Sequence, residues 1–140
     1  MGLRGICMVS RETAAETVSL VDDDAGVLTS VTRLLTSDGF SVRAFSEPAG
    51  FLEHVAANAV SLVILDVWME HMTGFEVQAK LARISPSTRV IIMTGRKDPG
   101  AEKTAMEFGA SAFFLKPFDG EEFLTAVHRA LLPSTGQDGK

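Results

Sequence analysis

The feature that most constrains the fold is a short apolar run that ends on a single carboxylate. Residues 61–65 are rich in Val, Ile and Leu, and Asp66 follows directly. A continuous apolar run of this length, bounded by polar and turn-forming residues, predicts a strand buried on both faces of a parallel sheet. Ligands of such sheets bind beyond the carboxyl ends of the strands, where Asp66 would lie. Considered alone, this aspartate could equally start a loop.

Segments of strand and helix character alternate along the rest of the chain. The predicted strands are residues 18–21, 41–45, 61–65, 89–94 and 112–115, and the predicted helices are residues 25–37, a helix from Pro48, and residues 74–83, 99–108 and 119–132. Five alternations predict an α/β fold with a parallel sheet, helices on both faces and right-handed crossovers. The order of the strands in space does not follow from periodicity.

Several residues suit the first positions of these helices. Asp24 and Thr73 are expected to cap the first and third helices, and Asp119 is expected to cap the last. Asp98 followed by Pro99 predicts a cap and a first helical residue for the fourth helix. The strand at 41–45 is expected near an edge of the sheet.

Length and composition limit the other possibilities. The chain has 140 residues, of which 46% are hydrophobic, enough for one domain with one core. The net charge of −5 argues against a nucleic-acid surface, and no apolar stretch approaches a membrane span. The single cysteine excludes an internal disulfide and is compatible with a reducing compartment. We expect a flexible extension at 1–17, the folded domain at 18–132, and a flexible tail or the start of a linker at 133–140.

Polar side chains follow the predicted strands at the point where each strand ends. Asp22 and Asp23 follow the first strand, Asp66 the third, Thr94 closes the fourth, and Lys116 follows the fifth. Carboxylates brought to one edge repel one another, and a divalent cation such as Mg²⁺, which prefers oxygen ligands, would relieve the repulsion. A hydroxyl and an ammonium group beside them could hold a phosphoryl group, and aspartate is a known covalent acceptor of one.

Four motifs together carry a resemblance to a known family. They are VDDD at 21–24, LDVWM at 65–69 with MTG at 72–74, MTG at 93–95, and FLKPF at 114–118. In this order and spacing they resemble the receiver domain of two-component response regulators, of the FixJ type, over residues 18 to 132. The resemblance implies a flavodoxin-like (βα)5 fold similar to the chemotaxis receiver, with three α/β/α layers and strand order 2-1-3-4-5.

The resemblance also implies the roles of the site residues. Asp66 would accept the phosphoryl group, and Mg²⁺, for which Mn²⁺ could substitute, would bind nearby. Asp23 and Asp66 would bind the metal directly, Asp22 mostly through metal-bound water, and Trp68 through its main-chain carbonyl. These roles depend on four segments far apart in the sequence meeting at one edge of the sheet.

By the same resemblance, Thr94 and Lys116 would hold the phosphoryl oxygens. Phe113 matches an aromatic switch position that turns inward as Thr94 moves, and the peptide bond between Lys116 and Pro117 is expected to be cis. The output face would comprise the fourth helix, the fifth strand and the fifth helix, and would contact a downstream effector or a second copy of the chain.

The expected phosphodonor is a phosphohistidine on a sensor histidine kinase or a histidine phosphotransfer protein, in the cytoplasm. The domain itself would not be an ordinary enzyme and would contact neither nucleic acid nor membrane. Receivers of the FixJ type usually precede a DNA-binding domain, so a stand-alone receiver and a piece of a longer regulator both remain open.

The chain departs from the family pattern in the loop after Asp66. The family usually has proline after Met69, and this chain has Glu70, which predicts an altered Mg²⁺ affinity of unknown sign. In the family, the positions of Trp68 and Arg96 tune how water reaches the acyl phosphate, so a bulky Trp68 is expected to shield it.

Each of these residues also has a simpler interpretation. The aspartates at 22–24 could simply cap a helix, Lys116 could be a surface charge, and Phe113 could be ordinary core. The chain could be an interaction module that never takes phosphate, although intact Asp66 and Thr94 argue against it. The acids in the first loop argue against a flavin phosphate site, and Trp68 replaces the second aspartate usual in aspartate-nucleophile phosphatases.

Overall fold

Five parallel strands form one sheet in the order β2-β1-β3-β4-β5. The computed structural model describes residues 16–133, so the predictions made for 1–15 and 134–140 lie outside the described residues. The strands are β1 (Thr17–Val21), β2 (Ser41–Phe45), β3 (Leu62–Asp66), β4 (Arg89–Thr94) and β5 (Ala112–Leu115). The predicted fold class and strand order are confirmed, and β2 is an edge strand as expected.

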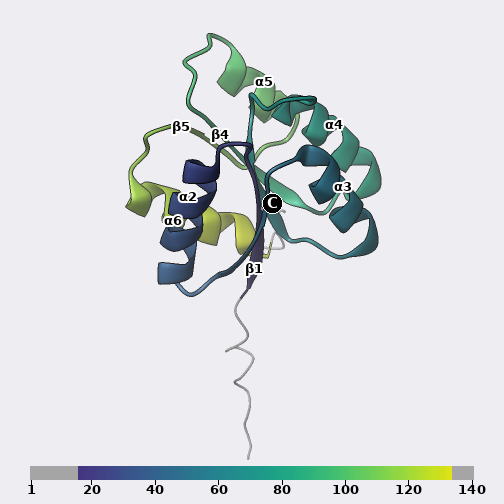
Figure 1. Ribbon diagram of the computed structural model, residues 1–140. Coiled ribbons are helices and arrows are strands. Elements are labelled where there is room, and N and C mark those ends of the chain that lie inside the picture. The colour runs from purple at the N-terminus through teal and green to yellow at the C-terminus, as the bar shows by residue number, and fades with distance from the viewer. Residues whose placement is uncertain (1–15, 134–140) are drawn as a thin grey trace, which may run out of the picture.

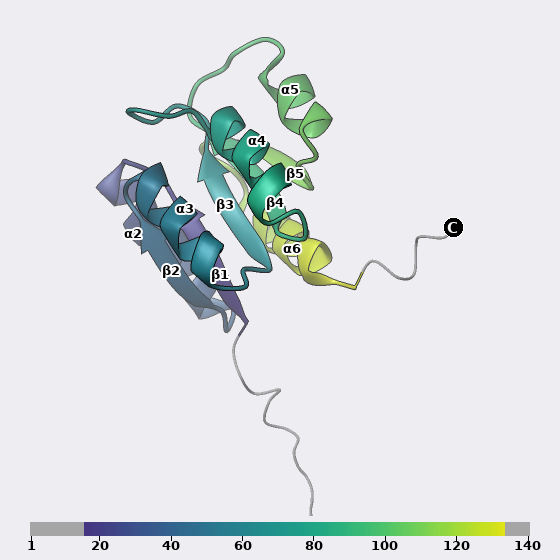
Figure 2. The ribbon, with the colours of Figure 1, turned by 90° about the vertical axis from the view of Figure 1, so that its right-hand side faces the viewer.

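The helices cover both faces of this sheet, which gives the three layers that the alternation predicts. They are α2 (Ala25–Ser37), α3 (Pro48–Ala57), α4 (Gly74–Ile84), α5 (Ala101–Glu107) and α6 (Gly120–Leu131). Figure 1 shows α2 and α6 on one side of the sheet and α3 and α4 on the other, and Figure 2 shows α3 and α4 from their own side.

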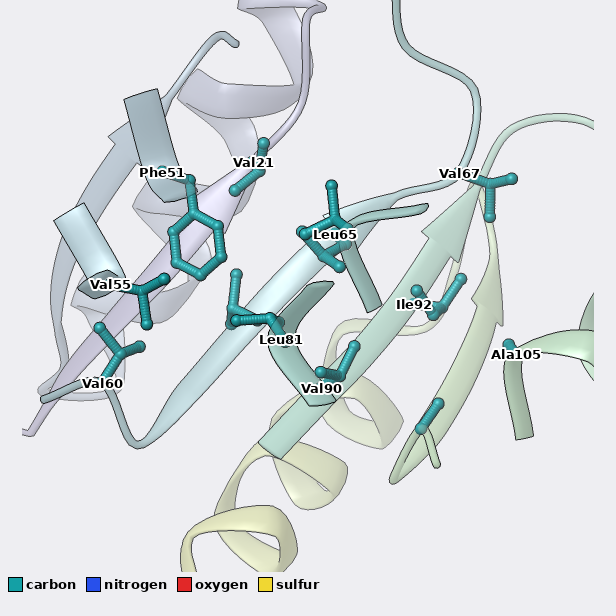
Figure 3. Close-up of a cluster of buried hydrophobic side chains, with 13 residues drawn as sticks. Val21, Phe51, Val55, Val60, Leu65, Val67, Leu81, Val90, Ile92 and Ala105 are labelled. Carbon is teal, nitrogen blue, oxygen red and sulfur yellow. The ribbon is translucent and has the colours of Figure 1, made fainter. Parts of the chain in front are cut away.

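The central strand β3 explains why its sequence is apolar without interruption. Its side chains alternate between two hydrophobic clusters, one on each face of the sheet. Val63 and Leu65 pack with Phe51 of α3 and Leu81 of α4, in the cluster drawn in Figure 3. Leu62 and Ile64 pack in the second cluster, with residues of α2 and α6. All five residues of β3 are therefore buried.

The helix caps were predicted correctly except at α5. The side chain of Asp24 accepts hydrogen bonds from the first turn of α2, and Asp119 does the same for α6. Asp98 does not cap α5, so that prediction was wrong. Its carbonyl instead accepts from the N–H of Ala101 at 3.0 Å in a turn, and Gly100 precedes the helix with a left-handed φ of 88°. The left-handed residue breaks the helical path that Pro99 would have begun.

The register of the strands brings the chemically interesting residues to one edge. Asp66 is the last residue of β3 and pairs with Met93 of β4, and the next residue of β4 is Thr94, which pairs with Leu115 of β5. The main-chain N–H of Lys116 donates to the carbonyl of Thr94 at 2.7 Å. Asp66, Thr94 and Lys116 thus stand side by side where the strands end.

Candidate functional site

Three carboxylates meet at the carboxyl edge of the sheet. Asp22 and Asp23 follow β1 and Asp66 ends β3, and one carboxylate oxygen of each lies within 4.8 Å of those of the other two. Asp22 and Asp66 are buried, with 1% and 5% of their surfaces exposed, whereas Asp23 is exposed. The cluster is therefore anchored in the protein on one side and open to solvent at Asp23.

Lys116 bridges the two buried carboxylates. Its Nζ lies 3.0 Å from Oδ2 of Asp22 and 3.4 Å from Oδ1 of Asp66. The lysine side chain is 19% exposed, so solvent screens these contacts much less than surface pairs. One ammonium group faces three carboxylates, and the cluster keeps an excess of negative charge.

This arrangement changes the acidity of both partners. Burial, and then the neighbouring charge of Asp22, raises the pKa of Asp66 from 3.8 to about 6, although Lys116 opposes the shift. Burial alone would lower the pKa of Lys116, but its hydrogen bond to Asp22 and the charges of both carboxylates outweigh that effect and raise it. Lys116 therefore stays charged, and Asp66 is mostly ionised above pH 6.

Thr94 is completely buried at the end of β4. Its Oγ1 accepts a hydrogen bond from the N–H of Arg96 at 3.2 Å, which ties the hydroxyl to the loop after β4. Phe113, on the neighbouring strand, is half-buried and packs against the cluster beneath α3 and α4. The roles that the family resemblance assigns to Thr94 and Phe113, including the switching movement of Phe113, stay predictions.

The backbone after Asp66 folds tightly against the start of α4. The N–H of Gly74 donates to the carbonyl of Val67 at 2.8 Å, and a Cβ built on Gly74 would lie 2.5 Å from the carbonyl oxygen of Asp66. No side chain fits at that distance, so glycine is required at position 74. Thr73, the predicted cap, forms a complete capping box together with Glu76.

Two contacts at the site were not predicted from the sequence. The main-chain N–H of Glu70 donates to Oδ2 of Asp23 at 3.0 Å, and the guanidinium of Arg96 stacks over the ring of Trp68, 4.5 Å from its centroid. The family resemblance marked Glu70, Trp68 and Arg96 as unusual or tuning positions. It carried no signal for the contacts, which depend on how loops from different strands approach each other.

The donor set fits a hard divalent cation. Three carboxylate oxygens close together with a single lysine form an oxygen-rich, negatively charged pocket of the kind that Mg²⁺ occupies with part of its water shell. Within residues 16–133, this is the only group of three acidic, histidine or cysteine side chains with such spacing. The contribution of the Trp68 carbonyl stays a prediction.

The fold and site together define a class of protein: a five-stranded doubly wound domain with an acidic pocket and a lysine at its carboxyl edge. The profile of the response regulator receiver domain matches residues 18–128, so the chain belongs to the receiver domain family. The acidic cluster of Asp22, Asp23 and Asp66 is consistent with phosphoacceptor signalling.

Individual relatives agree with this assignment. The chain is 39% identical to the response regulator protein TmoT of Ectopseudomonas mendocina over 81% of this chain and 52% of the relative. It is 38% identical to TodT of Pseudomonas putida over 84% of this chain and 52% of the relative. The chain thus spans about half the length of these curated relatives.

One solved structure shares the fold and 30% of the aligned sequence. The beryllofluoride-activated receiver domain of DrrB, a Thermotoga maritima protein, superposes with a TM-score of 0.75 at 30% identity, over 84% of this chain and 97% of that one. Separately, no helix within the described residues is long and apolar enough to cross a bilayer.

Proposed function

We propose that this receiver is a phosphorylation-dependent switch in which Asp66 is the phosphoacceptor. The observation that supports it most directly is Lys116, which bridges Asp22 and Asp66 at a buried edge of the sheet. Lysine paired with carboxylates in this way places one positive charge beside the atom that would carry a phosphoryl group. In an interaction module that never takes phosphate, the repulsion between these carboxylates would destabilise the fold without supporting a function.

The transfer proceeds by attack of one Asp66 oxygen on phosphorus. The bond between phosphorus and the imidazole nitrogen of the donor phosphohistidine breaks, and the donor histidine leaves. Because the pKa of Asp66 is about 6, the carboxylate is mostly ionised at neutral pH and serves as the nucleophile without a general base. Lys116 and the hydroxyl of Thr94 then hold the phosphoryl oxygens.

Mg²⁺ or Mn²⁺ is the proposed metal, held by Asp22, Asp23 and Asp66 together with the main-chain carbonyl of Trp68. When bound, it would neutralise charge on the transferring phosphoryl group. The residues of this chain orient the acceptor and hold the charges, and the domain acts catalytically only on its own phosphorylation and slow dephosphorylation. We therefore do not class it as an ordinary enzyme.

The readout of phosphorylation is proposed to be the face formed by α5, β5 and α6. A phosphoryl group adds a charge of about −1.5 to −2 and draws in Thr94 and Lys116. Thr94 ends β4 and Lys116 follows β5, and the N–H of Lys116 donates to the carbonyl of Thr94, so a shift of either residue would act on the start of this face. Large apolar side chains are exposed there, at Met106, Phe108 and Leu115. They suit an effector or a second copy of the chain.

The proposed partners follow from the relatives and the family. The phosphodonor is a sensor histidine kinase or a histidine phosphotransfer protein, and the location is the cytoplasm. TmoT and TodT are response regulators about twice as long as the matched region. A DNA-binding output elsewhere in the same protein is one arrangement that would use this switch.

Intact-mass spectrometry after incubation with acetyl phosphate and Mg²⁺ tests the proposal. The wild-type chain should gain the mass of one phosphoryl group, and the gain should disappear when Mg²⁺ is chelated. Asp66→Asn should gain none, and the surface variant Glu53→Gln should behave as wild type. An unmodified wild type, with both acetyl phosphate and a panel of phosphorylated kinases, would favour the phosphate-independent interaction module.

A further inference from the structure

The loop after β3 contains a contact that joins it to the loop after β1. The main-chain N–H of Glu70 donates to Oδ2 of Asp23 at 3.0 Å, across 47 positions of sequence. Asp23 is the exposed member of the acidic cluster, whereas Asp22 and Asp66 are buried and paired with Lys116. Asp23 is therefore the carboxylate that most needs an additional contact to fix its orientation.

We propose that the main-chain N–H of Glu70 is a positioning group that holds Asp23 ready for the metal. This inference rests on the proposed magnesium site. A carboxylate has two oxygens, so one can accept the hydrogen bond while the other binds a cation. Holding the side chain before the metal arrives reduces the conformational entropy lost on binding, and so strengthens binding.

The contact also gives a consequence of having Glu70 at a position where the family usually has proline. Proline has no N–H, so a chain with proline at position 70 could not make this hydrogen bond. The side chain of Glu70 is a weaker candidate for the same role. It is 83% exposed, and its nearest ionisable neighbour is the similarly exposed His71, 3.9 Å away. Solvent screens such surface charges, so the main chain, and not the carboxylate, carries the effect.

Two variants at the same position separate the main chain from the side chain. Glu70→Pro removes the N–H, and Glu70→Ala keeps it while removing the carboxylate. Trp68 is the only tryptophan and lies two residues after Asp66, so its fluorescence can follow a Mg²⁺ titration without any phosphorylation. We expect Glu70→Pro to raise the Kd for Mg²⁺ roughly three- to tenfold, as for a charge-assisted hydrogen bond at a partly exposed site. Glu70→Ala should stay within about twofold of wild type, and closer still at high salt.

A third variant removes the N–H without the ring of proline. Replacing the amide before Glu70 with an ester, by incorporation of the α-hydroxy analogue of glutamate, keeps the side chain, removes the N–H donor and makes the Met69 carbonyl a weaker acceptor. It should weaken Mg²⁺ binding to the same extent as Glu70→Pro. Urea unfolding without metal shows whether each variant folds. If Glu70→Pro does not fold, the ester variant alone tests the inference.

Several outcomes overturn the inference. Equal Mg²⁺ affinity for Glu70→Pro and Glu70→Ala would do so, as would an ester variant that binds like wild type, because the ring and not the missing donor would then be responsible. If wild type itself neither binds Mg²⁺ nor takes phosphate from acetyl phosphate, the proposed function fails as well. If wild type does both and the variants bind Mg²⁺ equally, only the role of Glu70 fails.

Discussion

Replacing Asp66 with asparagine should stabilise the folded chain at neutral pH when no divalent cation is present. In the native protein, burial and the charge of Asp22 raise the pKa of Asp66 from 3.8 to about 6. The ionised carboxylate is therefore less favourable in the folded chain than in the unfolded chain. Because each pKa unit corresponds to about 1.36 kcal/mol, the difference amounts to about 3 kcal/mol, and this is an upper limit for the gain.

The pH dependence follows from the direction of this shift. Between pH 3.8 and about 6, the folded chain holds a proton on Asp66 that the unfolded chain has released. Wild-type stability should therefore fall as the pH rises through this window, by the contribution of this group. Asparagine does not ionise, so the stability of Asp66→Asn should not show this fall. The gain should be fully present above pH 7 and mostly lost by pH 4.

Urea unfolding of wild type and Asp66→Asn in EDTA, at pH 4 and pH 7.5, measures this difference. Glu53→Gln, an exposed position on α3, controls for the removal of a carboxylate. Adding Mg²⁺ at ten times its Kd should stabilise wild type by about 1.4 kcal/mol and Asp66→Asn by less. The reasoning is refuted if Asp66→Asn is no more stable than wild type at pH 7.5, or if its gain is the same at both pH values.

Three further predictions use the same geometry. Lys116→Met should destabilise the fold by about 2 kcal/mol at pH 7.5 in EDTA, because two buried carboxylates lose their positively charged partner. The loss should be clearly smaller in the Asp66→Asn background, and a double-mutant cycle of urea unfolding midpoints measures this coupling. Gly74→Ala should cost about 2 kcal/mol or more because its Cβ meets the Asp66 carbonyl at 2.5 Å, whereas Gly50→Ala in α3 meets nothing closer than 3.6 Å and should be neutral or stabilising; equal thermal shifts would contradict this. Trp68→Ala should shorten the phosphoryl lifetime, since it removes the ring on which Arg96 stacks, and a decay rate equal to wild type, followed by intact mass, would count against shielding.

The fold was predictable because the residue pattern of each segment agrees with the way that segment packs in the whole domain. The apolar run before Asp66 corresponds to β3, which packs on both faces, and the caps at Asp24 and Thr73 were visible as residue types. The start of α5 was not predictable in the same way. An aspartate and a proline are good local signals for a helix, but Gly100 adopts a left-handed conformation that only the surrounding structure selects.

The candidate site was partly predictable for a related reason. Parallel strands bring their ends to one edge, so Asp66, Thr94 and Lys116 could be placed together from strand boundaries alone. Contacts between loops follow no periodicity, and the approach of Glu70 to Asp23 therefore needed the structure. The close approach of Gly74 to the backbone of Asp66 is equally invisible in a sequence.

A crystal structure of the chain with Mg²⁺ and beryllofluoride, which mimics an acyl phosphate, tests the central claim most directly. The account predicts beryllofluoride on a carboxylate oxygen of Asp66, contacted by Lys116 and the hydroxyl of Thr94, with Mg²⁺ beside it on Asp23. A structure in which Asp66 carries no beryllofluoride at saturating concentration, or in which Lys116 and Thr94 point away from it, would contradict the account.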